Sequence, residues 1–146
     1  MDAIVDISNK PKVRRKAVAT GLLLLSREGI DKINEGRTKK GDILEASTIA
    51  AIQAVKETSR MIPHCHNIPI EGSEVDWLVE EKGLRCTVSV VCNWNTGVEM
   101  EALVGASVSS LAVYDMCKGV SKGITIDYTR LEEKTGGANG TYSRSA

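Results

Sequence analysis

The sequence predicts an α+β fold with the ferredoxin-like order β-α-β-β-α-β, in which one antiparallel sheet carries helices on one face. Residues 74–79 and 84–93 alternate apolar and polar side chains, as half-buried strands do, and Lys82-Gly83 between them suits a hairpin turn. Segments with helical spacing of apolar residues stand before and after this hairpin, and a further strand is expected at each end of the series.

The elements before the hairpin follow from apolar spacing and from residues that end helices. An apolar run at 17–26 predicts the first strand, although its helix propensity leaves this assignment open. Residues 27–37 favour a short helix closed by Gly36. The main helix is expected to begin at Asp42, because Asp42 and the acidic residue three positions later together resemble a capping box. It is expected to end before Pro63. The two helices together take the place of the first helix in the ferredoxin-like order.

After the hairpin, Thr96 is a suitable N-cap for a long helix running to about Lys118, with Glu99 in the capping-box position. Residues 124–131 predict the last strand. Because the sequence shows neither internal repeats nor a linker, a single domain spanning residues 1–146 is expected.

The two ends of the chain are predicted to be less regular than the rest. Residues 1–15 suggest an extended basic arm, and residues 136–146 a small, polar, flexible tail that only a ligand would order. The sheet face opposite the helices needs a cover. Because aromatic residues make up only 3% of the chain, a neighbouring subunit is the expected cover.

The overall charge and the cysteines limit the possible functions. Lysine and arginine together number 19, as do aspartate and glutamate, so a general nucleic-acid binder, which normally carries a basic excess, is not expected. The four cysteines form no CxxC pair and are expected to be reduced thiols of a cytoplasmic protein. The apolar stretches are far shorter than the ~20 residues of a membrane helix, and the acidic first residues do not resemble a secretory signal.

Acidic side chains on the long helix are the first candidates for chemistry. Glu99, near the start of the helix, has the alternative role of a helix cap, whereas Glu101 falls outside that role. Asp115 and Lys118 lie three positions apart and are therefore neighbours on one helix face. They form either an ordinary surface ion pair or a proton-transferring carboxylate beside an ammonium group that also binds phosphate.

The separation of Glu101 from Asp115 constrains where a site can be. Fourteen positions along a straight helix span ~21 Å. A small-molecule pocket within one subunit can hardly contain both carboxylates. If both serve one site, they must come from different chains, which predicts a site at a subunit interface.

Both histidines of the chain fall in one loop, His64-Cys65-His66, after the main helix. A zinc site is conceivable, but a structural zinc needs four ligands and the sequence offers no second cluster, so no metal is expected. Substrate contact and loop packing remain as alternatives. Glycine-flanked lysines at 39–41 and 134–137 suit the close approach of an anion, although the sequence contains no P-loop motif.

Four segments of the chain resemble the signature blocks of a known family. They are Lys40-Gly41-Asp42, the Cys65-His66 loop, Thr96-Gly97-Val98-Glu99-Met100-Glu101-Ala102-Leu103 and Tyr114-Asp115-Met116-Cys117-Lys118. In this order and spacing they are similar to the MoaC family, the cyclic pyranopterin monophosphate synthases of molybdenum cofactor biosynthesis. The resemblance extends from Val5 to Gly137, which is nearly the whole chain.

The resemblance implies a lyase that converts (8S)-3′,8-cyclo-7,8-dihydroguanosine 5′-triphosphate into cyclic pyranopterin monophosphate and pyrophosphate without a cofactor. It also implies a homohexamer, a trimer of dimers, with active sites at the dimer interfaces. The alternatives are a non-catalytic nucleotide-binding module of the same fold and a metal-dependent hydrolase that uses the histidine loop.

On the matching positions, Asp115 corresponds to the family's catalytic aspartate, and Lys40 and Lys118 to its essential lysines. Other positions fall on substrate-binding segments or are expected to line the pocket: Asp6, Lys10, Arg15, His64, Cys65, His66, Glu99, Met100, Glu101 and Lys134. The chain departs from the family pattern in two places. His64 stands where leucine is usual, and Ala138-Asn139 replaces the usual Lys-Ser, so the tail loses one cation.

Overall fold

The computed structural model describes residues 1–138 and 140–145; Asn139 and Ala146, which belong to the predicted tail, lie outside the described residues. Strands and helices alternate along the chain as the sequence predicts, with additional short strands. In chain order they are β1 (Val13–Leu24), α1 (Arg27–Glu35), β2 (Arg37–Thr38), β3 (Gly41–Asp42), α2 (Ile43–Met61), β4 (Gly72–Val79), β5 (Gly83–Trp94), α3 (Glu99–Cys117), β6 (Thr125–Thr135) and β7 (Tyr142–Ser143).

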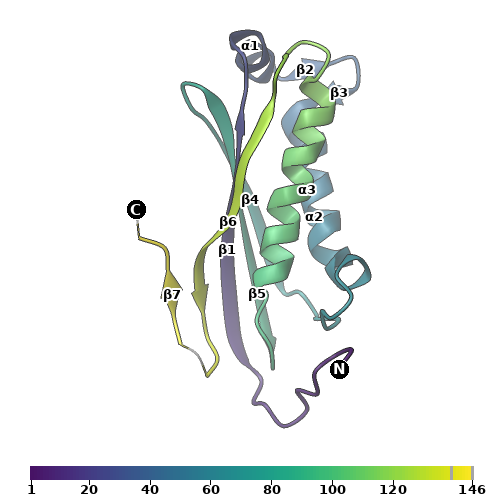
Figure 1. Ribbon diagram of the computed structural model, residues 1–146, viewed down its shortest axis with the longest axis vertical. Helices are drawn as coiled ribbons and strands as arrows, with labels where there is room; N and C mark the ends of the chain where they lie inside the picture. Colours follow the sequence, from purple (N-terminus) through teal and green to yellow (C-terminus); the bar gives the residue numbers. More distant parts are fainter. Residues whose placement is uncertain (139, 146) are drawn as a thin grey trace.

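One antiparallel sheet with the strand order β4-β5-β1-β6-β7 forms the body of the molecule. Helices α2 and α3 lie side by side on one face of this sheet, and α1 sits near one end together with the β2–β3 hairpin (Figure 1). The four long strands have the order of a ferredoxin-like fold, with the first strand between the third and the fourth. The predicted fold class is confirmed.

The core is built from small and β-branched side chains that bring α3 close to the sheet. Ala17 and Ala19 of β1 are fully buried against α3, which contributes Ala102 and Ala106. Strand β1 lies very close to α3 at Gly21, where a Cβ would lie 2.6 Å from Ser110 Oγ and 3.2 Å from a backbone carbonyl oxygen of α3. A chain without phenylalanine therefore fills its core by close approach of backbones, not by large rings.

The ends of the first two helices follow the predicted signals. Gly36 closes α1 with a φ of 90°, in the left-handed region that glycine favours. Asp42 is the N-cap of α2, and its carboxylate accepts a 2.8 Å hydrogen bond from the backbone N–H of Glu45. The helix ends at Met61, and Ile62 adopts an extended conformation before Pro63, as the restriction on residues that precede proline requires.

The predicted N-cap of α3 is wrong. Val98, not Thr96, is the N-cap residue, and no side chain accepts a hydrogen bond there. Val98 is fully buried in the core, so burial of an apolar side chain fixes where the helix begins. The Glu99 carboxylate instead folds back over Gly97, where a side chain at that position would collide with it.

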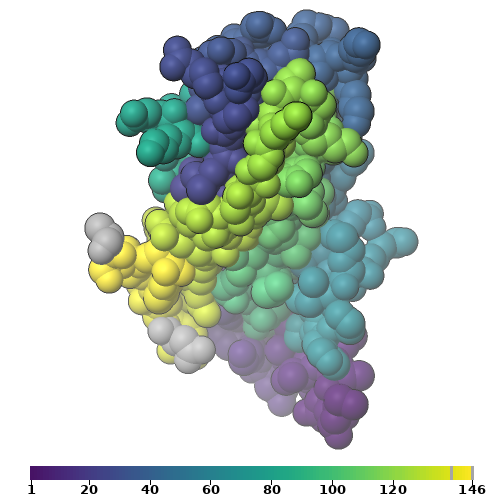
Figure 2. All heavy atoms as spheres, turned by 45° about the horizontal axis from the view of Figure 1, so that its top comes forward, coloured from purple at the N-terminus to yellow at the C-terminus, as the bar shows by residue number. Residues whose placement is uncertain are grey.

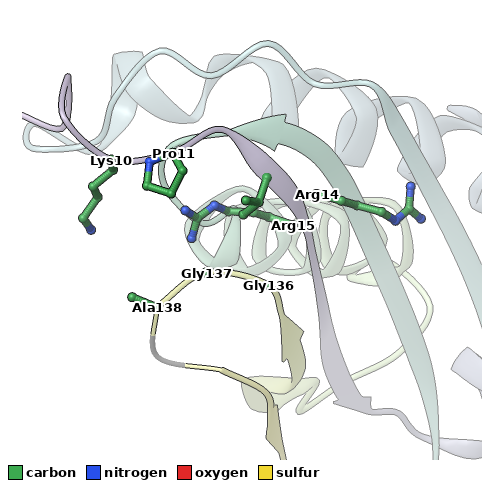
Figure 3. A pocket seen from close by; sticks show the side chains of 8 residues that line it. Lys10, Pro11, Arg14, Arg15, Gly136, Gly137 and Ala138 are labelled. Carbon is green, nitrogen blue, oxygen red and sulfur yellow. The ribbon is translucent and has the colours of Figure 1, made fainter.

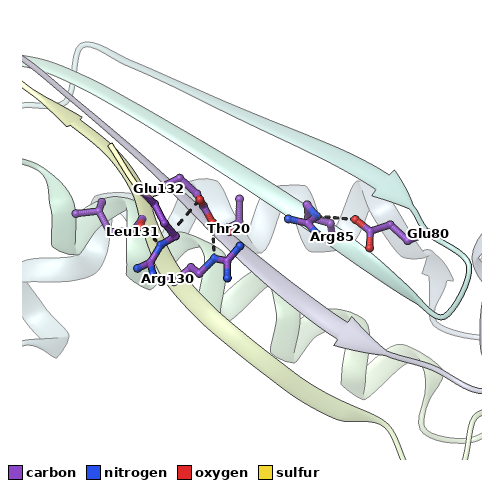
Figure 4. A network of polar contacts seen from close by, with 7 residues as sticks. Thr20, Glu80, Arg85, Arg130, Leu131 and Glu132 are labelled. Atoms are coloured by element: carbon purple, nitrogen blue, oxygen red, sulfur yellow. Dashed lines mark hydrogen bonds and ion pairs between the residues drawn. The ribbon is translucent and has the colours of Figure 1, made fainter. Parts of the chain in front are cut away.

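The sheet face away from the helices carries a polar network as well as apolar side chains. The Glu132 carboxylate accepts hydrogen bonds from Thr20 Oγ1 at 2.7 Å and from Arg130 Nε at 2.6 Å (Figure 4). Arg130 also stacks on Tyr128, with its guanidinium carbon 4.0 Å from the ring centroid, and Arg85 pairs with Glu80 at 2.6 Å. These charged groups can face either water or a polar partner surface, so cover of this face by a neighbouring subunit stays a prediction.

Both chain ends are more regular than predicted. The basic arm runs into β1, so Arg14 and Arg15 belong to a strand. At the other end, Tyr142–Ser143 pairs with β6 as β7, opposite Glu133 and Lys134. Figure 2 shows the C-terminal segment (yellow) at the left of the molecule and the N-terminal residues (purple) at its lower right. The chain's own sheet edge therefore orders part of the predicted tail.

Candidate active site

Two lysines hold the Asp115 carboxylate at the end of α3. Lys40, on the turn between β2 and β3, places Nζ 2.7 Å from Asp115 Oδ2, and Lys118, one turn after the aspartate, places Nζ 3.1 Å from Oδ1. The predicted catalytic residues Asp115, Lys40 and Lys118 therefore meet in one subunit. We call them the lysine–aspartate cluster.

Hydrogen bonds from Lys40 and then from Lys118 lower the pKa of Asp115 below its usual value. The carboxylate is therefore ionised at neutral pH, while two ammonium groups leave the cluster with an excess of positive charge. The cluster lines a depression of about 440 Å³ to which Lys32 and Lys39 also contribute. Such a depression suits an anionic ligand. Lys32 could not be identified from the sequence, because α1 carries no motif.

A second depression, of about 350 Å³, lies at the other end of α3. It brings together most of the predicted binding residues from three separate segments. Its lining comprises Val5, Ile7, Lys10, His64, Cys65, His66, Ile68, Thr96, Gly97, Glu99, Met100 and Glu101.

Glu101 is the most unusual group of this depression, because its side chain is only 3% exposed. Burial raises the pKa of Glu101 to about 6, and the neighbouring Glu99 adds to the increase. Among the ion pairs of the described residues, none involves Glu101, whereas Glu99 lies 3.7 Å from Lys134 Nζ. A carboxyl group with this pKa exchanges protons readily near neutral pH.

Cys65 lies beside these carboxylates, and burial together with the charges of Glu101 and Glu99 raises the pKa of its thiol. The thiol is therefore protonated at neutral pH and is a poor nucleophile. Cys65 therefore contributes to the lining of the depression and does not act as a nucleophile.

Arg15 and Lys10 line a third depression of about 380 Å³ with Gly136 and Gly137 (Figure 3). Arg15 is 8% exposed, and its Nε donates a 3.0 Å hydrogen bond to the carbonyl of Trp94. Gly137 has a φ of 86° and passes so close to the guanidinium that a Cβ there would collide with Nη1. Because Lys10 lines both the second and the third depression, the two are neighbours.

Like Lys134, which pairs with Glu99, Asp6 is a predicted binding residue that lines none of these depressions. Its carboxylate accepts hydrogen bonds from the backbone N–H of Ser8 at 2.9 Å and from Ser8 Oγ at 2.7 Å, and these bonds lower its pKa. Asp6 thus shapes the turn before Lys10. Asn95, which the sequence analysis missed, donates a 3.1 Å hydrogen bond to the carbonyl of Ile7.

The predicted residues therefore fall into two groups at opposite ends of α3, separated by the ~21 Å expected for a straight helix. Within residues 1–138 and 140–145, no His, Cys, Asp or Glu side chains gather in a set of three or more that could hold a metal ion. In the same part of the chain, each helix lacks the length or the apolar character to cross a bilayer.

Comparison with known proteins places the chain in one family. The model of the MoaC family matches residues 4–137. The cyclic pyranopterin monophosphate synthase of Bacillus mycoides (strain KBAB4) is 46% identical over 147 residues, which cover 98% of this chain and 91% of the relative. The proteins of the same name from Peptoclostridium acidaminophilum and Clostridium perfringens (strain 13 / Type A) are 39% and 42% identical over 98% and 96% of this chain, and 91% and 90% of the relatives. The chain belongs to the MoaC family.

Proposed function

We propose that this protein is a cyclic pyranopterin monophosphate synthase, a lyase of molybdenum cofactor biosynthesis. Its substrate is (8S)-3′,8-cyclo-7,8-dihydroguanosine 5′-triphosphate, and it releases pyrophosphate. The observation that carries the proposal is the lysine–aspartate cluster, a carboxylate held between two ammonium groups, in a chain that resembles synthases of this name over 98% of its length.

The reaction needs proton transfers and stabilisation of phosphate charge, with no change of oxidation state. The purine's five-membered ring opens, a pyrazine ring closes, and an oxygen of the sugar attacks the α-phosphorus while the bond to pyrophosphate breaks. Asp115 is ionised and can accept a proton, and the ammonium groups of Lys40 and Lys118 can donate one or neutralise the departing pyrophosphate. The Arg15 depression offers a second cationic surface for the triphosphate.

We propose further that each active site combines the lysine–aspartate cluster of one subunit with the Glu101 depression of another. An exposed apolar stripe on α3 connects the two groups and supports this arrangement. Leu111 on this stripe is 54% exposed, and Met100 and Tyr114 are each 37% exposed. The stripe consists of Met100, Val104, Val108, Leu111 and Tyr114, at helical spacing.

A helix with such a stripe gains stability when a second copy covers it. Val108 lies midway between Glu101 and Asp115. If two copies of α3 pack antiparallel around a two-fold axis near Val108, Asp115 of each copy faces Glu101 of the partner subunit. Packed helices lie about 8–10 Å apart, a distance that facing side chains and a small ligand can bridge.

Three such dimers would form the homohexamer that the family resemblance implies, and we propose the cytoplasm as its location. The four cysteines are free thiols, three of them buried, which suits a reducing compartment. The balanced net charge and the closed apolar core give no support to a nucleic-acid or membrane partner.

The proposal is tested by incubating the purified protein with the cyclic triphosphate and measuring cyclic pyranopterin monophosphate and pyrophosphate. We expect Asp115→Asn and Lys40→Ala each to reduce product formation about 100-fold or more, because a positioned acid or base contributes roughly 10²–10⁴ in rate. Both side chains are exposed by more than half, so both variants should keep the circular dichroism and the oligomeric state of the parent protein.

The matched control is Glu57→Gln, which removes an exposed carboxylate that pairs with Arg60 on α2, away from the depressions described above. It should leave the rate unchanged. A non-catalytic nucleotide-binding module would bind the cyclic triphosphate and return it intact. Recovery of unchanged substrate from the unsubstituted protein, or normal turnover in Asp115→Asn, would refute the proposed function.

A further inference from the structure

We propose that residues 3–10 form a strap over the Glu101 depression, and that His64 is the positioning residue that holds the free end of this strap closed. The inference rests on the proposed function, because it concerns access to the same site. It assigns a role to a histidine that the sequence analysis could place only on a binding segment.

Side chains from two loops contact alternate carbonyls in the first part of the strap, over residues 3–7. Ala3 O contacts His64 Nδ1, Val5 O lies 2.6 Å from His66 Nε2, and Ile7 O accepts from Asn95 Nδ2 at 3.1 Å. A carbonyl oxygen is only an acceptor, so each of these ring nitrogens must carry the proton. Contacts at every second residue over 3–7 resemble the pairing of a strand edge, with side chains instead of a neighbouring strand as the partners, before the chain turns at residues 8–10.

The inner side of the strap forms part of the depression. Val5, Ile7 and Lys10 line it opposite Cys65 and Glu101, so the strap is one wall of the cavity. Both views of the whole molecule show the N-terminal residues against the segment that follows α2 (Figures 1 and 2). Displacement of the strap would open this wall to solvent.

Little besides these hydrogen bonds holds the strap in place. Ile4 and Val5 are 54% and 57% exposed, and residues 1–10 contain no helix or strand. A single hydrogen bond of this kind contributes about 1 kcal/mol, so the strap can open and close without unfolding of the rest of the chain. These properties suit a segment that admits a ligand and then closes over it.

His64 offers the cleanest test of the strap. His64 and His66 both line the depression and Lys10 is a predicted ligand contact, but the hydrogen bond from His64 Nδ1 goes to the outermost carbonyl of the strap. Leucine at 64 removes the donor while retaining bulk. Asparagine restores a donor at nearly the position of Nδ1, so the pair His64→Leu and His64→Asn separates the hydrogen bond from the presence of an imidazole.

Amide hydrogen exchange of the peptide covering residues 1–10 is measured with and without the cyclic triphosphate, together with KM and kcat. We expect His64→Leu to speed exchange in this peptide about fivefold and to raise KM by a similar factor, with kcat within about twofold, as loss of one ~1 kcal/mol bond predicts. His64→Asn should return exchange and KM to the values of the unsubstituted protein.

The outcomes separate the strap from the proposed function. Unchanged exchange in His64→Leu overturns the strap, and faster exchange with an unchanged KM overturns the positioning role of His64. Failure of His64→Asn to restore both quantities would show that the hydrogen bond is not the cause. If the unsubstituted protein makes no product, the proposed function fails, while exchange and its response to the cyclic triphosphate still report on the strap.

Discussion

At the scale of single residues, burial of Glu101 gives its carboxyl group a pKa suited to proton transfer, but lowers the stability of the protein when the group is ionised. Its folded-state pKa of about 6 lies above the ordinary value of 4.5, because burial penalises the charge. The folded protein therefore binds this proton more tightly than the unfolded chain does. Stability from this group is fully present below pH 4.5 and is lost as pH rises through about 6.

The variant Glu101→Gln removes this penalty. At pH 7.5 we expect it to be more stable than the unsubstituted protein by about 2 kcal/mol in urea unfolding at equal protein concentration, and the difference should vanish below pH 4.5. Glu99→Gln is the matched control, because Glu99 is partly exposed and pairs with Lys134, so no gain is expected. A stability difference that did not change between pH 4 and 7.5 would contradict a charge effect.

The sequence identified many of the site residues, but it did not predict how they are arranged in space. The spacing of Asp115 and Lys118 predicted that they are neighbours, and the family resemblance assigned Lys40 to the same site; the structure shows the contact that Lys40 makes from a distant turn. Residue spacing alone could not predict the Lys40 contact, because it depends on how the β2–β3 hairpin packs near the end of α3. Asn95 was missed for the same reason: its role depends on where the N-terminal segment passes.

At the scale of elements, the close approach of α3 to β1 makes Gly21 a sensitive position. We expect Gly21→Ala to destabilise the protein by about 1–3 kcal/mol, because the new Cβ meets Ser110 Oγ and a helix carbonyl that cannot both move away. Urea unfolding measures the change. Gly72→Ala on strand β4 is the control, since its Cβ would meet only Val91, at 4.0 Å. Equal effects of the two substitutions would show that strand propensity, not the contact with α3, decides the outcome.

Helices and long strands were predictable because their signals are local. Gly36, Asp42 and Pro63 each act on their own backbone, and the predicted ends of α1 and α2 are confirmed at these residues. The start of α3 depended instead on burial of Val98, a tertiary effect that overrides the capping preference of Thr96. Strand β7 could not be predicted either, because a two-residue strand exists only through its pairing with β6.

At the scale of the whole molecule, the length of α3 separates the two halves of the candidate site. The sequence predicted this separation from the count of residues between Glu101 and Asp115, and the continuous helix from Glu99 to Cys117 confirms it. Its consequence, a site shared between two subunits, stays a prediction. Subunits that carry different defects provide a direct test.

Co-expression of Asp115→Asn with Glu101→Gln should restore activity that neither variant has alone. In a mixed dimer with two-fold symmetry, one site contains both damaged side chains and the other contains neither, so equal random mixing should recover about a quarter of normal turnover. Turnover is measured as pyrophosphate release at matched protein concentration.

Mixing Asp115→Asn with Lys40→Ala provides the control. These two residues meet within one subunit at 2.7 Å, so every site of every mixed dimer lacks one of them and activity should stay absent. Recovery in this control would mean that Lys40 reaches the site of the partner subunit. No recovery in the first mixture would mean that Asp115 and Glu101 do not act across the two-fold axis, and the apolar stripe on α3 would then need another partner.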